Sequence, residues 1–202
     1  MFRPAAIVPA KGGTNGLVTD FSDWGVAGTG KWGSSSGLNG TIFGYTDGGN
    51  ASTTMTAAGS TAGLHLTGKV GTWAGGGLSF LSCTKVDTFT QVRFDIKAAA
   101  SACTVQMQIP TFDQRPMENI PAGGCKADGG TACYQSPGMA NIVSLSTVIT
   151  TPTAVTKVLQ GNFSNWSSAN AKQVVGVRWQ FVNPGSGTCP IDVTVTSVRF
   201  VP

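Results

Sequence analysis

Apolar and polar residues alternate along several short segments of the chain, and no segment of useful length repeats its apolar residues at helical spacing. Strict alternation is typical of strands that turn one face to a core and the other to water. It predicts strands over Leu64–Val70, Gly77–Leu81, Val92–Lys97, Thr104–Ile109, Val175–Phe181 and Ile191–Thr196, and a weaker strand over Thr153–Leu159.

Clusters of Gly, Ser, Asn and Pro separate these segments, as turns do. Many short strands with such turns predict an all-β fold, a single antiparallel β-sandwich of the jelly-roll type. A chain of 202 residues is expected to form one such domain, over residues 14–202, after an N-terminal extension over residues 1–13. The irregular stretch from Thr111 to Thr147 is predicted to be a functional loop, because long loops in compact domains usually are.

Charged residues make up only 11% of the chain, where a soluble domain usually has about 25%. Solubility through hydroxyls, amides and turns is typical of secreted β-sandwiches, so we expect a secreted or cell-surface protein. The net charge is +4, but Lys and Arg are scattered without a basic run, which argues against a nucleic-acid partner. No stretch is apolar for long enough to predict a membrane span.

Five cysteines leave at least one free or paired between chains. Cys125 and Cys133 bracket a glycine-containing loop and are predicted to form a disulfide; a zinc site there is disfavoured by the spacing and by the distant single histidine. If the strands at 92–97 and 191–201 pair antiparallel, Cys103 and Cys189 meet at one end of the sheet. We therefore predict Cys103–Cys189, with a Cys83–Cys103 bond as the open alternative, and an oxidising compartment in either case.

Seven motifs follow one another along the chain: Asp20–Trp24, Gly40–Asp47, Gly63–Gly68, Trp73–Phe80, Val92–Lys97, Val105–Ile109 and Val193–Phe200. Their order resembles the galactose-binding-like β-jelly-roll domains, above all the non-catalytic carbohydrate-binding modules of secreted glycan-degrading enzymes. The resemblance implies a polysaccharide or oligosaccharide partner, and a monomer or a module of a larger secreted protein.

No cofactor is required by this interpretation, but such modules often hold a structural calcium ion. Asp20 and Asp23 match the acidic N-terminal element of that site, whereas Thr196 and Ser197 stand where an Asp-Asp pair is common. Calcium needs several oxygen ligands, usually with carboxylates among them. The resemblance thus implies a calcium site at Asp20 and Asp23, and the missing pair argues that it is absent, weak or completed by backbone carbonyls.

In the fold that the resemblance implies, two of the alternating strands share a sheet and leave one polar face. Amides offer donors and an acceptor together, and a guanidinium offers a fork of donors, which suits sugar hydroxyls. The alternative is that these residues merely cover the wet face of a sheet. The predicted ligand-binding residues of this face are Gln106, Gln108, Arg178 and Gln180.

Sugar sites also use aromatic rings as stacking platforms. Trp73, Trp32 and Tyr134 are the predicted platforms, with Arg115 beside Tyr134 in the long loop, although each ring could instead pack against its own loop. His65 alternates with two leucines on a strand and is interpreted as structural.

Catalysis is disfavoured because few acids are placed for it. A glycosidase needs two carboxyl groups, and only Asp113 and Glu118 lie together in a loop. A serine triad would need His65, and no nucleophile elbow is present. The prediction is therefore a non-catalytic carbohydrate-binding module; the alternatives are an all-β polysaccharide-active hydrolase or lyase, and a structural or adhesive surface domain.

Overall fold

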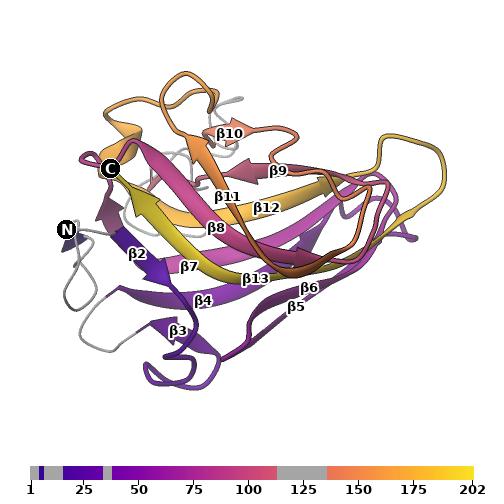
Figure 1. The fold of residues 1–202 in the computed structure, drawn as a ribbon, viewed down its shortest axis with the longest axis horizontal. Helices are drawn as coiled ribbons and strands as arrows, with labels where there is room; N and C mark the ends of the chain where they lie inside the picture. The colour runs from indigo at the N-terminus through magenta and orange to yellow at the C-terminus, as the bar shows by residue number, and fades with distance from the viewer. Residues whose placement is uncertain (1–4, 7–15, 34–37, 113–135) are drawn as a thin grey trace.

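A computed structural model describes residues 5–6, 16–33, 38–112 and 136–202, and this part of the chain forms two β-sheets that lie one on the other (Figure 1). The seven-stranded sheet has the order β10-β9-β12-β7-β4-β3, with β1 paired to β7. The six-stranded sheet has the order β11-β8-β13-β6-β5, with β2 paired to β13. Neighbouring strands run antiparallel except β1 and β7, which are parallel.

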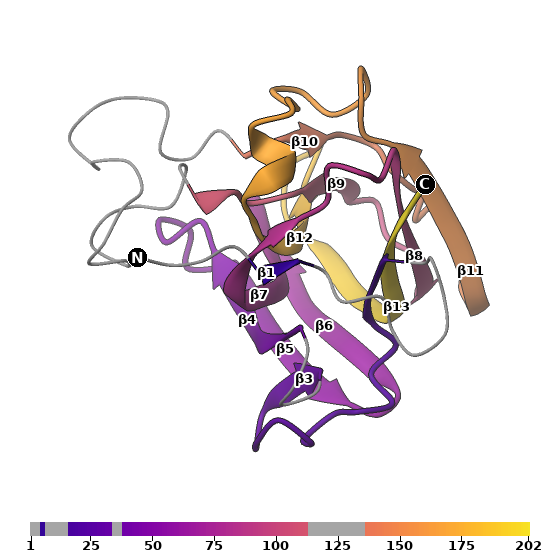
Figure 2. The same ribbon diagram turned by 90° about the vertical axis from the view of Figure 1, so that its left-hand side faces the viewer.

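Figure 2 shows the two layers from the side, with β4 and β7 on the left and β8 and β11 on the right. The arrangement is the single antiparallel β-sandwich that the alternation predicted. The strands of the seven-stranded sheet are β1 (Ala5–Ala6), β3 (Lys31–Gly33), β4 (Asn39–Thr46), β7 (Trp73–Lys85), β9 (Thr104–Gln108), β10 (Gly138–Met139) and β12 (Val174–Val182). Those of the six-stranded sheet are β2 (Gly16–Thr19), β5 (Thr54–Ser60), β6 (Gly63–Val70), β8 (Gln91–Ala98), β11 (Ile149–Val158) and β13 (Cys189–Val201), and a short 3-10 helix, η4 (Asn170–Lys172), precedes β12.

The predicted strands are all present, as β6, part of β7, β8, β9, β12, β13 and β11. β6, β8, β9 and β12 match the predicted ends to within one residue. β7, β11 and β13 are longer than predicted, since β11 begins at Ile149 and β13 continues to Val201. The alternation did not predict β4 and β5, which are rich in Gly, Thr and Ala. It also placed a turn before Gly77, whereas β7 begins at Trp73 and runs through three successive glycines. Pairing with β4 on one side and β12 on the other keeps this glycine-rich segment extended.

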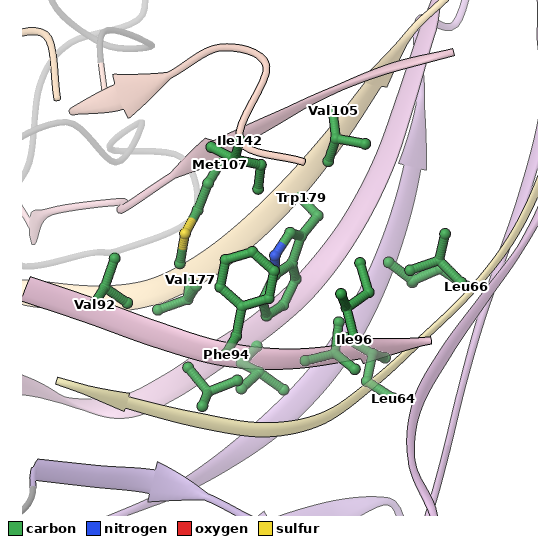
Figure 3. Close-up of a cluster of buried hydrophobic side chains, with 14 of the residues drawn as sticks. Leu64, Leu66, Val92, Phe94, Ile96, Val105, Met107, Ile142, Val177 and Trp179 are labelled. Atoms are coloured by element: carbon green, nitrogen blue, oxygen red, sulfur yellow. The ribbon is translucent and has the colours of Figure 1, made fainter. Parts of the chain in front are cut away.

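The core lies between the sheets and is built from the inward positions of each strand. Trp179 of β12 meets Phe94 of β8 edge to face, with ring centroids 5.6 Å apart. Leu64 and Leu66 of β6 approach from the six-stranded sheet, and Met107 of β9 from the other, all fully buried (Figure 3). Alternation with period two puts every second residue of these strands into this core.

A disulfide joins Cys103 to Cys189, whose Cα atoms lie 5.6 Å apart. This confirms the predicted pairing and excludes Cys83–Cys103. The antiparallel pairing of β8 with β13 that the prediction assumed is also present. Cys103 immediately precedes β9 and Cys189 begins β13, so the bond ties one sheet to the other. Cys125 and Cys133, as well as the side chain of Cys83, lie outside the described residues.

The N-terminal extension contributes β1, whose Ala5 and Ala6 lie beside Thr84 and Lys85 at the end of β7. The boundary between this extension and the domain stays a prediction. None of the helical segments in the described ranges has the length and apolar character of a membrane span.

We expect loss of the Cys103–Cys189 bond to lower the free energy of unfolding by about 2–5 kcal/mol, because the cross-link restricts the unfolded chain. The bond spans a sequence separation of 86 residues, which makes that restriction large. In reductant, thermal unfolding of the wild type should shift down to the midpoint that a Cys103→Ala/Cys189→Ala variant has in the same reductant. The variant lacks the Cys103–Cys189 bond and therefore has no contribution from it to lose in reductant. Equal unfolding midpoints for the oxidised wild type and the variant would contradict a stabilising Cys103–Cys189 bond.

Candidate functional site

The predicted polar residues of β9 and β12 meet on the outer face of the seven-stranded sheet. Gln108 lies opposite Arg178, and Gln106 lies opposite Gln180. Their neighbours Met107 and Trp179 are fully buried on the inner face. Strict alternation in both strands therefore brings two amides of β9 beside the guanidinium and amide of β12.

Two rows of residues cross the sheet at right angles to its strands. One row runs through Tyr45 on β4, Gly75 on β7, Gln180 on β12 and Gln106 on β9. Three strand spacings separate the ends of such a row, a span of about 14 Å.

The second row lies alongside the first at the next outward positions. It runs through Phe43, Gly77, Arg178 and Gln108. Each row thus has an aromatic ring at its β4 end, a glycine on β7 and polar side chains on β12 and β9. We call the side chains of the two rows, together with Trp73, the outer-face array.

Tyr45 connects the aromatic and polar halves of the array. Its hydroxyl donates to Oε1 of Gln180 at 3.3 Å, and its ring centroid lies 5.6 Å from Cζ of Arg178, within the range of a cation–π contact. The Nε–H of Arg178 in turn donates to Oε1 of Gln108. These contacts link β4, β12 and β9 through side chains alone.

The glycines of β7 make these contacts possible. A Cβ atom on Gly75 would lie 2.6 Å from Oη of Tyr45 and 2.3 Å from the carbonyl oxygen of Trp179. A Cβ atom on Gly77 would lie 2.8 Å from Cβ of Arg178. Both distances to side chains are shorter than side-chain packing allows, so the Tyr45 and Arg178 side chains take the room that β7 leaves.

Three aromatic rings form a continuous row at one side of the array. Phe43 and Tyr45 stack with centroids 6.0 Å apart and an interplanar angle of 23°. Trp73, at the start of β7, lies 5.9 Å from Tyr45 at 52°. All three rings are partly buried and therefore keep some exposed surface.

Burial shapes the ionisation of the two central groups. It raises the pKa of Tyr45 to about 12, against a smaller opposite effect of the nearby Arg178 charge. Burial also lowers the pKa of Arg178, which the proximity of Tyr45 partly offsets. Near neutral pH the phenol is therefore an uncharged hydrogen-bond donor beside a charged guanidinium.

Trp32 is not a platform, which corrects the sequence prediction. It lies on β3 fully buried, packs edge to face on Phe80 with centroids 5.5 Å apart, and donates from Nε1 to the carbonyl of Thr41. The ring fits because Gly40 lies beneath it: a Cβ atom there would come within 2.6 Å of the indole. The glycines next to Trp32 in the sequence indicated an exposed loop, whereas the ring is buried and it is Gly40, on the paired strand β4, that makes room for it.

Trp73 does belong to the array, although it lies on a strand rather than in a loop. Tyr134 and Arg115 fall outside the described residues, as do Asp113 and Glu118. Tyr45 and Phe43 were missed as site residues. Their alternation in Phe43-Gly44-Tyr45 was the available signal, since it puts both rings on one face of a strand.

Asp20 and Asp23 both accept hydrogen bonds, Asp20 from its own turn and Asp23 from the end of β3. The Ser22 hydroxyl donates to Asp20 at 2.6 Å and holds the pKa of that carboxyl below its usual value, while the backbone N–H of Gly33 donates to Asp23 at 3.0 Å. In the described ranges no three His, Cys, Asp or Glu side chains gather closely enough to hold a metal. These two carboxylates alone do not fit calcium, which needs six to eight oxygens, so the ion stays a prediction.

His65 lies exposed on β6, with Nε2 2.8 Å from Oδ1 of Asp192. This pair lies on the six-stranded sheet, whereas the array lies on the seven-stranded one.

A separate hollow of about 330 Å³ lies near the disulfide. Its lining has hydroxyl groups but neither an aromatic ring nor a charged side chain, so it lacks a stacking platform. The lining residues are Ser101, Ala102, Cys103, Thr104, Asn141, Val143, Ser144, Leu145 and Ser146.

No known family model matches the sequence, and no curated protein matches it either. Among solved structures, the chain is similar to a family 11 carbohydrate-binding module of a cellulosomal cellulase of Clostridium thermocellum, at 12% identity and a TM-score of 0.44, over 93% of this chain and 94% of that one. The same family from Clostridium thermocellum, in complex with a β-1,3-1,4-mixed-linked tetrasaccharide, gives 10% identity and a TM-score of 0.44 over 79% and 88%. The glycoside hydrolase domain of Endo-D from Streptococcus pneumoniae R6 gives 12% and 0.42, over 80% of this chain but only 21% of that one.

A Gly75→Ala substitution is expected to lower the free energy of unfolding by about 1–3 kcal/mol, because the new methyl group overlaps the backbone of β12 and the Tyr45 hydroxyl. Gly49→Ala is the matched control, since its Cβ would meet nothing closer than the Asp47 carbonyl oxygen at 4.0 Å. The control should stay within about 0.5 kcal/mol of the wild type. Urea unfolding of both variants measures the difference, and equal stabilities would contradict the close packing over β7.

Tyr45 is expected to ionise with a pKa of about 12 in the folded protein. The chain has two tyrosines, so a Tyr134→Phe variant reports Tyr45 alone in a tyrosinate absorbance titration. The same titration in denaturant should return the midpoint to about 10. Because the folded pKa is the higher one, the stability due to the buried phenol is complete below about pH 10 and falls as pH rises towards 12. A midpoint near 10 in the folded state would show that Tyr45 is freely hydrated.

Proposed function

We propose that the outer-face array binds a polysaccharide without cleaving it. The observation that supports this proposal is the contact of the Tyr45 and Trp73 rings with one another next to a row of amides and a guanidinium, all on one sheet face. Sugar rings present apolar C–H faces and polar hydroxyl edges, and the array has a counterpart for each.

The hydrogen-bonding groups are suited to hydroxyls. Oε1 of Gln180 and Oε1 of Gln108 each accept one bond from within the array, which fixes the direction of both amides. Each amide oxygen has a second lone pair and each amide nitrogen two donors. Hydroxyls that donate and accept at once can pair with both kinds of group.

The array is also elongated, which suits a chain rather than a single sugar. A row spans about 14 Å from β4 to β9, with rings at one end and amides at the other. Its side chains stand on paired strands rather than on loops, so little conformational entropy is lost when a ligand binds.

The described residues of the array offer no pair of carboxyl groups for glycoside hydrolysis. The strands of the seven-stranded sheet contain neither Asp nor Glu. Asp113 and Glu118, the pair that the enzyme alternative would use, lie outside the described residues. Product release must therefore be measured together with binding.

Affinity electrophoresis on a panel of soluble polysaccharides, with product release assayed on the same samples, tests the proposal. Retardation without product is the expected outcome; product would establish the hydrolase or lyase alternative. Absence of both would favour a structural or adhesive domain. A parallel series with EDTA tests the calcium prediction at Asp20 and Asp23, because chelation should weaken retardation only if a bound ion supports the fold or site.

A Trp73→Ala substitution should weaken binding to the polysaccharide that retards the wild type by about three- to tenfold, because one stacking contact is lost. Tyr45→Ala should cost at least as much, because it also removes the hydrogen bond to Gln180. His65→Ala, an exposed change on the other sheet, is the control. Unchanged retention by both ring variants, with their unfolding midpoints preserved, would place the binding site elsewhere.

A further inference from the structure

We infer that the polysaccharide is acidic, and that Arg178 pairs with an anionic group on it, a uronate carboxylate or a sulfate ester. This inference rests on the proposed function and adds the chemical class of the ligand.

The strands of the two sheets differ in whether they contain acidic residues. The strands of the seven-stranded sheet contain Lys31, Lys85 and Arg178 but neither Asp nor Glu. The strands of the six-stranded sheet contain Asp95 and Asp192 among their cations. The sheet that has the proposed site is therefore the one without negative side chains in its strands.

Arg178 has no anionic partner in the described part of the chain. The two ion pairs found there are Arg93–Asp95 and His65–Asp192, both within the six-stranded sheet. The partners of Arg178 are instead the Gln108 amide and the face of the Tyr45 ring. A neutral amide and a ring orient a guanidinium, but they do not neutralise it.

The geometry of these contacts leaves the outer end of the guanidinium for a ligand. Gln108 accepts from Nε, so the terminal nitrogens retain their hydrogen-bond donors. Two parallel N–H groups of this kind match a carboxylate or a sulfate in a bidentate pair. Arg178 stands on β12, between β7 on one side and β9 on the other, and so lies in the middle of the array.

A partly buried charge that has no counter-ion among the described residues is unfavourable, and burial also lowers the pKa of Arg178. An anion on the ligand would compensate this cost, whereas neutral hydroxyls would not. Hydroxyls alone could be bound by glutamines, of which the array already has three, Gln106, Gln108 and Gln180. The high pKa of Tyr45 fits the same interpretation, because a neutral phenol beside Arg178 does not repel an anion.

The test compares polymers that differ only in charge. Polygalacturonate is paired with its carboxyl-reduced form, and a sulfated galactan with its desulfated form, so that the two pairs distinguish a carboxylate from a sulfate. The proteins are the wild type, Arg178→Gln, Arg178→Lys and, as a matched control for net charge, Lys97→Gln on the exposed face of β8.

For one of the two pairs, we expect the wild type to bind the charged polymer about tenfold or more tightly than the neutral one. Arg178→Gln should abolish this ratio, Arg178→Lys should retain part of it because the charge stays while the fork is lost, and Lys97→Gln should leave it unchanged. A preference that Lys97→Gln reduces as much as Arg178→Gln would reflect net charge alone and would overturn the inference. Equal or tighter binding of the neutral polymers would overturn it and leave the proposed function intact, whereas absence of binding to any polysaccharide would overturn both.

Discussion

Trp179 packs against Phe94 across the two sheets, with ring centroids 5.6 Å apart, and this contact holds β12 in its register. Truncating a buried tryptophan typically costs about 3–5 kcal/mol, enough to specify which face of the strand turns inward. A slip of one residue would bury the Arg178 guanidinium and expose the indole. The indole Nε1 has no hydrogen-bond partner in the described part of the chain, a cost of about 1–3 kcal/mol that the packing of the ring must exceed. The outward position of Arg178 and the inward position of Trp179 are thus one and the same constraint.

The array also depends on β7, a central strand of the seven-stranded sheet that has glycines at the two outward positions next to Trp73. Gly75 and Gly77 lie between the outward positions of β4 and those of β12. A larger residue at either position would separate Tyr45 from Gln180 and displace Arg178. The cost of placing glycines in a strand is an entropic one of about 0.5–1 kcal/mol each relative to alanine. The pairing of β7 on both sides offsets this cost.

Alternation along the sequence predicted the strands whose inner positions are large and apolar, and with them the outward direction of Gln106, Gln108, Arg178 and Gln180. It could not predict β5, in which Met55 is the one large apolar residue and no residue is fully buried. It also could not distinguish glycines that make a turn from glycines that make room, as Gly40 does for the buried Trp32. Tyr45 and Gln180 are 135 positions apart in the chain, so only the strand order brings them together.

Under the proposed function, the same strand order decides which ligands the array would discriminate. Gln108 and Tyr45 hold Arg178 from opposite sides, so its orientation is fixed before a ligand arrives and little rotamer entropy remains to be lost. Groups fixed in this way discriminate more by charge and direction than by contact area, since a ligand without a matching anion leaves the guanidinium uncompensated. Under the proposed function, the aromatic row of Phe43, Tyr45 and Trp73 would contribute no such discrimination, because any sugar with an apolar face could stack on it. The proposed site would thus separate stacking, at its β4 side, from selectivity, at β12 and β9.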